Sequence, residues 1–153
     1  MKKVKIEAFH VIGISVRTTN ENQQAAKDIP ALWSRFMSEG IQAKIPNKID
    51  AEVLSIYTNY EGDHTKPYDT ILGCRVSSLD VVPEGMVAQS FEGGSYVEFV
   101  SKGDMNQGAV YNTWLEIWNA DLDRKFTADF EVYGEKAKNP ANIEVPIFVA
   151  LKE

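Results

Sequence analysis

FTADFEVY, residues 126–133, alternates apolar and polar side chains with a period of two. This period is typical of a β-strand whose two faces meet different surroundings. Residues 143–151 alternate in the same way, and the polar segment between the two stretches predicts a hairpin connection. A one-faced helix is predicted just before them, over residues 106–119. Its apolar face is formed by Tyr111, Trp114, Leu115 and Trp118.

The same order of elements occurs in the first half of the chain. Residues 4–18 alternate as one long strand, and residues 28–37 carry apolar side chains at the spacing of a one-faced helix. Asp28 is expected to cap that helix, Pro30 suits its first turn, and Gly40 is expected to end it. Strands are predicted over residues 52–60 and 68–76. The second half begins with an extended stretch, residues 86–100, that Gly93 and Gly94 interrupt.

These matching orders predict an α+β fold made of duplicated β-α-β-β modules. The halves cover about residues 1–80 and 81–153, and one helix from each module should cover an antiparallel sheet or pair of sheets. The linker, residues 77–85, is short, so residues 1–153 are expected to form a single domain.

Composition limits the partners and the compartment. The chain has 22 acidic and 16 basic residues, a net charge of -6, which disfavours direct binding of nucleic acid or of an anionic membrane. It has a single cysteine, Cys74, and no apolar run long enough to span a bilayer or to act as a leader. A cytoplasmic location is therefore expected. His10 and His64 share no spacing with other ligands that predicts a metal site, and no cofactor motif is present.

The strand faces suggest a binding site. If the aliphatic sides of the strands all lie under the helices, Glu131, Tyr133, Phe148 and Tyr57 share the opposite, open face. Aromatic rings around one carboxylate would form the floor of a site for a cation. Burial would raise the pKa of Glu131 in the empty site, and a bound cation would lower it. Alternatively, Glu131 is a solvated side chain and the rings are cross-strand pairs.

Four motifs together resemble the gyrase-inhibitor-like (GyrI-like) or AraC-type effector-binding family. They are Phe9–Gly13 followed by Arg17 and Thr18, Phe91–Phe99 followed by Lys102 and Gly103, the helix 111–118, and the pair Phe130–Tyr133 and Ile143–Ile147. The resemblance implies duplicated modules with a ligand cleft between the halves. In this family several members bind lipophilic cationic drugs through a glutamate ringed by aromatics, and Glu131 matches that glutamate. Many are attached to DNA-binding segments of the MerR or AraC type, and this chain has none, so a stand-alone member is expected.

The predicted function is therefore capture of aromatic or cationic small molecules, for sensing or sequestration. The candidate ligand-binding residues are Glu131, Tyr57, Tyr133, Phe148, Trp114, Trp33 and Phe9. The tryptophans are also at helical core spacing, so a structural role for Trp33, Trp114 and Trp118 stays open. A non-enzymatic protein is favoured. Two alternatives remain: a hydrolase that uses Glu131 with a pocket tryptophan, and a module that binds gyrase or a DNA-binding regulator. A homodimer also remains open.

Overall fold

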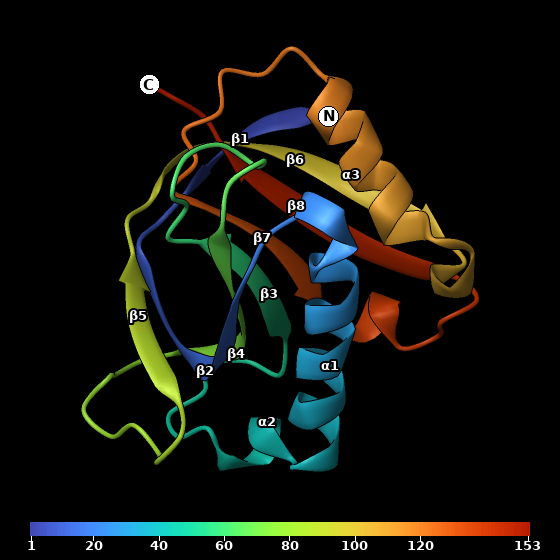
Figure 1. Cartoon of the computed structure of the whole chain (residues 1–153). Coiled ribbons are helices and arrows are strands. Elements are labelled where there is room, and N and C mark those ends of the chain that lie inside the picture. The colour runs from blue at the N-terminus through green and yellow to red at the C-terminus, as the bar shows by residue number, and fades with distance from the viewer.

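The computed structural model describes all 153 residues and has two layers, an antiparallel sheet of eight strands and a layer of helices on one of its faces (Figure 1). None of its helices combines the length and the hydrophobicity that a membrane-spanning segment needs. The strands are β1 (Lys2–Ile6), β2 (Phe9–Thr18), β3 (Val53–Thr58), β4 (Tyr68–Val76), β5 (Val87–Phe91), β6 (Gly94–Gly103), β7 (Ala128–Tyr133) and β8 (Ile143–Ala150). The helices are α1 (Ala25–Ser38), the short α2 (Ile41–Lys44) and α3 (Ala109–Asn119), with 3₁₀ turns at Glu21–Gln23, Met105–Gln107 and Glu135–Ala137.

The strand order confirms the α+β fold and its duplication. It runs β1-β6-β8-β7-β3-β4-β2-β5, so that the order β6-β8-β7 of the second module mirrors β2-β4-β3 of the first. The modules meet where β7 pairs with β3, and Glu131 there lies opposite Ser55. The halves therefore share one continuous sheet.

The first strand of each half pairs with the other half. The stretch predicted as one strand over residues 4–18 is interrupted at Glu7 and Ala8. Before the interruption β1 pairs with β6, and after it β2 pairs with β4 and β5. The connection between β1 and β2 crosses the connection between β5 and β6, and the two touch at this crossing: a Cβ on Gly93 would lie 2.2 Å from the carbonyl oxygen of Ile6. Only glycine fits at that crossing.

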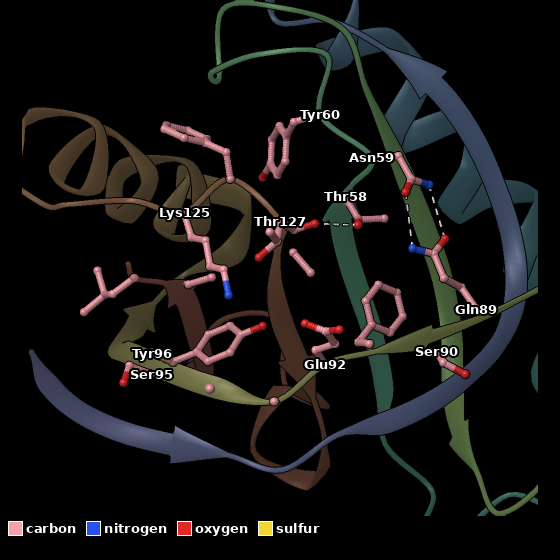
Figure 2. A pocket seen from close by; sticks show the side chains of 17 residues that line it. Thr58, Asn59, Tyr60, Gln89, Ser90, Glu92, Ser95, Tyr96, Lys125 and Thr127 are labelled. Atoms are coloured by element: carbon pink, nitrogen blue, oxygen red, sulfur yellow. Dashed lines mark hydrogen bonds between the residues drawn. The ribbon is translucent and has the colours of Figure 1, made fainter. Parts of the chain in front are cut away.

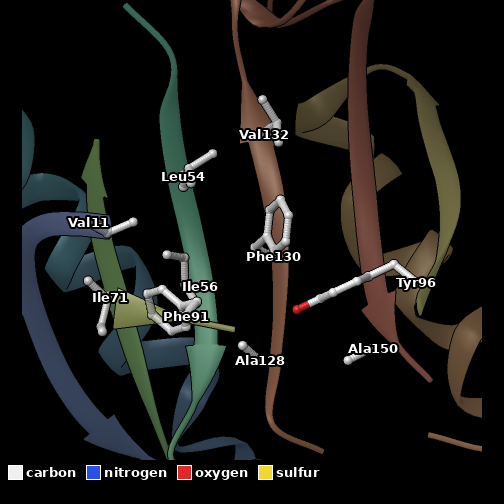
Figure 3. Close-up of a cluster of buried hydrophobic side chains, with 10 residues drawn as sticks. All are labelled: Val11, Leu54, Ile56, Ile71, Phe91, Tyr96, Ala128, Phe130, Val132 and Ala150. Carbon is white, nitrogen blue, oxygen red and sulfur yellow. The ribbon is translucent and has the colours of Figure 1, made fainter. Parts of the chain in front are cut away.

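Hydrophobic clusters fill both faces of the sheet. On the helix-covered face, α1 packs Leu32 and Phe36 against β2 and β4, and α3 packs Trp114 and Ile117 against β6 and β8. A third cluster lies on the opposite face, where the sheet curls round it (Figure 3). It consists of Val11, Leu54, Ile56, Ile71, Phe91, Tyr96, Ala128, Phe130, Val132 and Ala150.

The prediction that all aliphatic strand faces lie under the helices is wrong. The β8 set that includes Ile147 does lie under α3, but Phe130 of β7 and Ile56 of β3 point into the third cluster. The register explains this, because Glu131 pairs with Ile147 and Phe130 pairs with Phe148. Glu131 therefore lies on the helix-covered face and not on an open one.

Helix α1 begins earlier than predicted. It starts at Ala25, with Gln24 as its N-cap, so Asp28 is not the cap but lies in the first turn, where its charge favours the helix dipole. Pro30 lies inside the helix, where its missing N–H removes one hydrogen bond. Gly40 has a φ of +59° and directly follows the C-cap, as predicted for the end of α1.

Candidate functional site

A cavity of about 690 Å³ opens between α1 and α3 above the sheet. Its floor is formed by Tyr57 of β3 and by Glu131 and Tyr133 of β7. The α1 side supplies Ala25, Ala26, Ile29, Pro30 and Trp33, and the α3 side supplies Val110, Tyr111, Trp114 and Trp118. Asn20, Gln23, Tyr60, His64, Tyr68 and Arg124 complete the lining. Because each helix belongs to a different module, the cavity lies between the halves.

The aromatic residues are divided sharply between cavity and core. All three tryptophans and five of the six tyrosines line this cavity, whereas none of the seven phenylalanines does. Tyrosine and tryptophan each combine an apolar ring with a hydrogen-bonding group. The cavity therefore offers ring faces for apolar contact and polar groups for orientation.

Glu131 is the polar centre of the cavity floor. Its residue is 2% exposed. Its Oε2 atom accepts hydrogen bonds from the Tyr57 hydroxyl and the Trp114 Nε1–H, each at 2.7 Å, and its Oε1 atom accepts one from the Tyr133 hydroxyl at 2.5 Å. Burial and the nearby Glu131 charge raise the pKa of Tyr57 and Tyr133 well above the ordinary value, so both hydroxyls remain donors. Three ring-bearing side chains thus fix the carboxylate.

No cationic side chain compensates Glu131. The ion pairs of the chain do not include it, whereas Asp129, two residues away on β7, pairs with Arg124 at 2.7 Å. Desolvation raises the pKa of Glu131, and the hydrogen bonds from Tyr133, Tyr57 and Trp114 oppose that rise. A buried carboxylate with neutral partners alone is costly. Such a group is a candidate for a functional role.

Asp129 has a structural environment. In addition to Arg124, it accepts hydrogen bonds from the Tyr60 hydroxyl at 2.6 Å and from the Ala150 backbone N–H at 2.8 Å. The last contact connects β7 to β8. The two carboxylates of β7 therefore differ: Asp129 is satisfied by a cation within the protein, and Glu131 is not.

Five of the seven predicted site residues meet in this cavity: Glu131, Tyr57, Tyr133, Trp114 and Trp33. The Trp33 ring lies edge-on to Tyr133, with centroids 4.9 Å apart, and Tyr57 lies edge-on to Trp114 at 5.5 Å. These contacts join the α1 and α3 walls to the floor.

The structure does not place Phe148 and Phe9 in the cavity. Phe148 stacks on Phe130 at 5.0 Å, and Phe9 stacks on Phe91 at 5.1 Å, both on the face of the sheet away from the helices. Phe148 lies on the face away from the helices, as predicted. It is outside the cavity because Glu131, Tyr57 and Tyr133, which were expected to share its face, lie on the helix-covered one.

Sequence reasoning missed several lining residues. Tyr60, Tyr68, Tyr111 and His64 were not predicted to bind ligand, and the role of Trp118 was left open between core and cavity. The Tyr68 hydroxyl donates to Asn20 Oδ1 at 2.7 Å, and the His64 ring stacks on Trp118 at 5.7 Å. The available signal was residue type: tyrosines and tryptophans, unlike phenylalanines, gather at the cavity.

The chain contains one module twice on a single sheet, and a cavity lies between the helices of the two copies. This arrangement defines a GyrI-like effector-binding domain. The family model of Cass2, the integron-associated effector-binding proteins, matches residues 4–151, and the chain belongs to this family.

Known relatives agree with this assignment. The chain is 34% identical to an integron cassette protein from the mobile metagenome of Vibrio cholerae, with a TM-score of 0.76 over 99% of this chain and 95% of that one. It is 30% identical to YobU of Bacillus subtilis (strain 168), whose name describes a candidate transcriptional regulator, over 92% of this chain and 91% of that protein. The fold also resembles SAV2435, solved bound to tetraphenylphosphonium: the TM-score is 0.80 at 17% identity, and the match covers 99% of this chain and 93% of that one.

Proposed function

We propose that this protein binds aromatic, lipophilic cations in the cavity between α1 and α3, as a sensor or as a sequestering protein, with Glu131 as their counter-charge. The observation that carries the proposal is the uncompensated carboxylate of Glu131, 2% exposed and held by donors from Tyr57, Tyr133 and Trp114. A cationic guest would supply the positive charge that the protein itself omits.

The surrounding rings favour the same guests. Cations gain about 0.5–2 kcal/mol over each well-placed tryptophan or tyrosine face. A positive charge about 5 Å from the carboxylate gains about 3 kcal/mol at an effective dielectric constant of about 20. Because Tyr57, Tyr133 and Trp114 are already hydrogen-bonded to Glu131, the negative charge is oriented before a guest arrives. The structure of SAV2435 with tetraphenylphosphonium shows that one protein of this fold accepts a guest of this class.

The test compares two guests of equal shape and opposite charge. Quenching of tryptophan fluorescence should report binding of tetraphenylphosphonium, because all three tryptophans line the cavity. Tetraphenylborate should bind far more weakly. Glu131→Gln should weaken tetraphenylphosphonium binding by about tenfold to a hundredfold, since the charge attraction of about 3 kcal/mol is reduced by residual dipole contacts.

Glu116→Gln is the matched control. Glu116 is exposed on α3, so this substitution makes the same change in net charge outside the cavity and should leave the affinity unchanged. Equal binding of the two guests, or equal affinities of wild type and Glu131→Gln, would remove the proposed role of the carboxylate.

A further inference from the structure

A second cavity lies on the other side of the sheet. It has a volume of about 320 Å³ and is bordered by the Phe91–Ser95 crossing, by the end of β3 and by the chain that enters β7 (Figure 2). This volume is at the small end of the range for ligand pockets, so it suits a guest smaller than the aromatic cations discussed above.

Three polar side chains point into this second cavity. Figure 2 shows the Lys125 amine, the Glu92 carboxylate and the Tyr96 hydroxyl directed towards its interior. Lys125 and Glu92 are exposed residues of opposite charge, and neither forms an ion pair within 4 Å. An ammonium and a carboxylate therefore face one space without meeting.

Tyr96 is the most informative of the three. The residue is 3% exposed, and its ring packs edge-on to Phe130 at 5.7 Å within the third hydrophobic cluster. Its hydroxyl has no hydrogen-bond partner in the protein. The hydroxyl oxygen is not fully enclosed by other atoms, so it reaches the cavity that Tyr96 lines. Burial raises the pKa of Tyr96 to about 12, which keeps the hydroxyl protonated and able to donate. Buried tyrosine hydroxyls are normally satisfied.

We propose that this second cavity is a binding site for a small zwitterion of the amino-acid type. Lys125 and the Tyr96 hydroxyl bind the carboxylate of the guest, and Glu92 binds its ammonium group. The apolar part of the guest lies against Phe91, Phe126 and Ala128, which also line the cavity. A guest with one charge alone would contact only one of Lys125 and Glu92, so a guest that carries both charges gains one more charged contact than either singly charged analogue.

The experiment titrates amide-labelled protein with L-phenylalanine and follows the backbone signals of Gly93, Gly94 and Lys125 by NMR. Phenethylamine and 3-phenylpropionate, which keep the ring and one charge each, serve as matched probes. L-phenylalanine should shift these signals with an affinity at least about tenfold higher than either probe, because each probe lacks one of the two charged contacts.

Substitutions separate the roles. Lys125→Gln and Glu92→Gln should each weaken L-phenylalanine binding by about tenfold or more, Tyr96→Phe should weaken it by a smaller factor, and Lys125→Arg should retain it. Lys27→Gln, which alters an exposed lysine on α1, should have no effect. Absence of shifts at the second cavity, equal responses to all three probes, or unchanged binding by Lys125→Gln would overturn the proposal.

The two sites are tested independently. Glu131→Gln should leave L-phenylalanine binding intact, and Lys125→Gln should leave tetraphenylphosphonium binding intact. If only one of these ligands binds, the corresponding proposal stands and the other fails.

Discussion

Tyr57→Phe tests how the carboxylate of the main cavity is maintained. The substitution removes the hydroxyl that donates to Glu131 Oε2 at 2.7 Å and keeps the ring that packs against Trp114 and Tyr68. A hydrogen bond to a charged group contributes about 1.5–3 kcal/mol. A hydrogen bond to the neutral form contributes only about 0.5–1.5 kcal/mol, so about 1–1.5 kcal/mol is specific to the charged form. At 1.36 kcal/mol per pKa unit, the loss should raise the pKa of Glu131 by about one further unit.

The sign of the pH effect follows from proton linkage. The pKa of Glu131 in the folded protein is already raised, so the folded state binds more protons than the unfolded state, and stability falls as pH rises through that range. In Tyr57→Phe the fall should be steeper and should extend to higher pH. At high pH the variant should lose about 1.5–3 kcal/mol of unfolding free energy. At low pH, where Glu131 is neutral, it should lose only about 0.5–1.5 kcal/mol.

Urea denaturation of wild type and variant across a pH series measures this difference. Tyr68→Phe is the matched control, since its hydroxyl also faces the cavity but donates to the neutral Asn20 amide. Its loss should be about 0.5–1.5 kcal/mol at every pH. If Tyr57→Phe shows the same pH-independent loss as Tyr68→Phe, the carboxylate of Glu131 does not carry a buried charge and the reasoning fails.

Three further predictions concern the cavity and the sheet. Tetraphenylphosphonium affinity should rise by up to about tenfold per pH unit while Glu131 loses its proton, and should then become constant. Glu131→Gln should show no such rise. Fluorescence titrations across pH measure both profiles, and two flat profiles would contradict the prediction. Arg124→Leu should lower the free energy of unfolding by about 3–5 kcal/mol, because it leaves Asp129, which is 0% exposed, without its cation. Adding Asp129→Asn should recover part of the loss. Urea denaturation measures both, and an unaltered midpoint in the single variant would refute a buried ion pair. Gly93→Ala should lower the melting temperature, because its Cβ would lie 2.2 Å from the Ile6 carbonyl oxygen. Gly85→Ala is the control: its Cβ meets nothing within 4 Å, so its melting temperature should fall only by the amount that the positive φ of Gly85 causes.

Sequence alternation was sufficient for the order of elements, except that residues 4–18 form two strands, but it was not sufficient for the faces of the sheet. Residues 68–76 were predicted as a strand with the bounds that β4 has. The face that carries Glu131 was misassigned because hydrophobic clusters cover both sides of the sheet. A period of two separates two faces, and it does not say which face a helix covers.

The break between β1 and β2 shows a second limit of the pattern. Val4 and Ile6 pack against the third cluster, as Phe9 and Val11 do, so the inward-facing positions change from even to odd at the crossing. The sequence alternates through this point without a visible change of phase. The crossing depends on contacts with Gly93, which is far away in the chain.

The main cavity could be predicted only in part. Glu131 was found because a carboxylate lay between aromatic positions, and Trp114 because it sits on the apolar side of a helix. The hydrogen bond from Trp114 to Glu131 joins α3 to β7, a distant contact that no local spacing encodes. The family resemblance supplied the expectation of a cleft between halves, which the geometry of α1 and α3 confirms.

The reciprocal placement of β1 and β5 has a consequence for how this architecture could arise. β1 extends the sheet beside β6, and β5 extends it beside β2, so each repeat is completed by a strand that the other provides. An isolated repeat would leave β2 with an unpaired edge, which promotes association. A single-repeat ancestor would therefore have needed a second copy of itself, and gene fusion would have converted that two-chain assembly into one polypeptide.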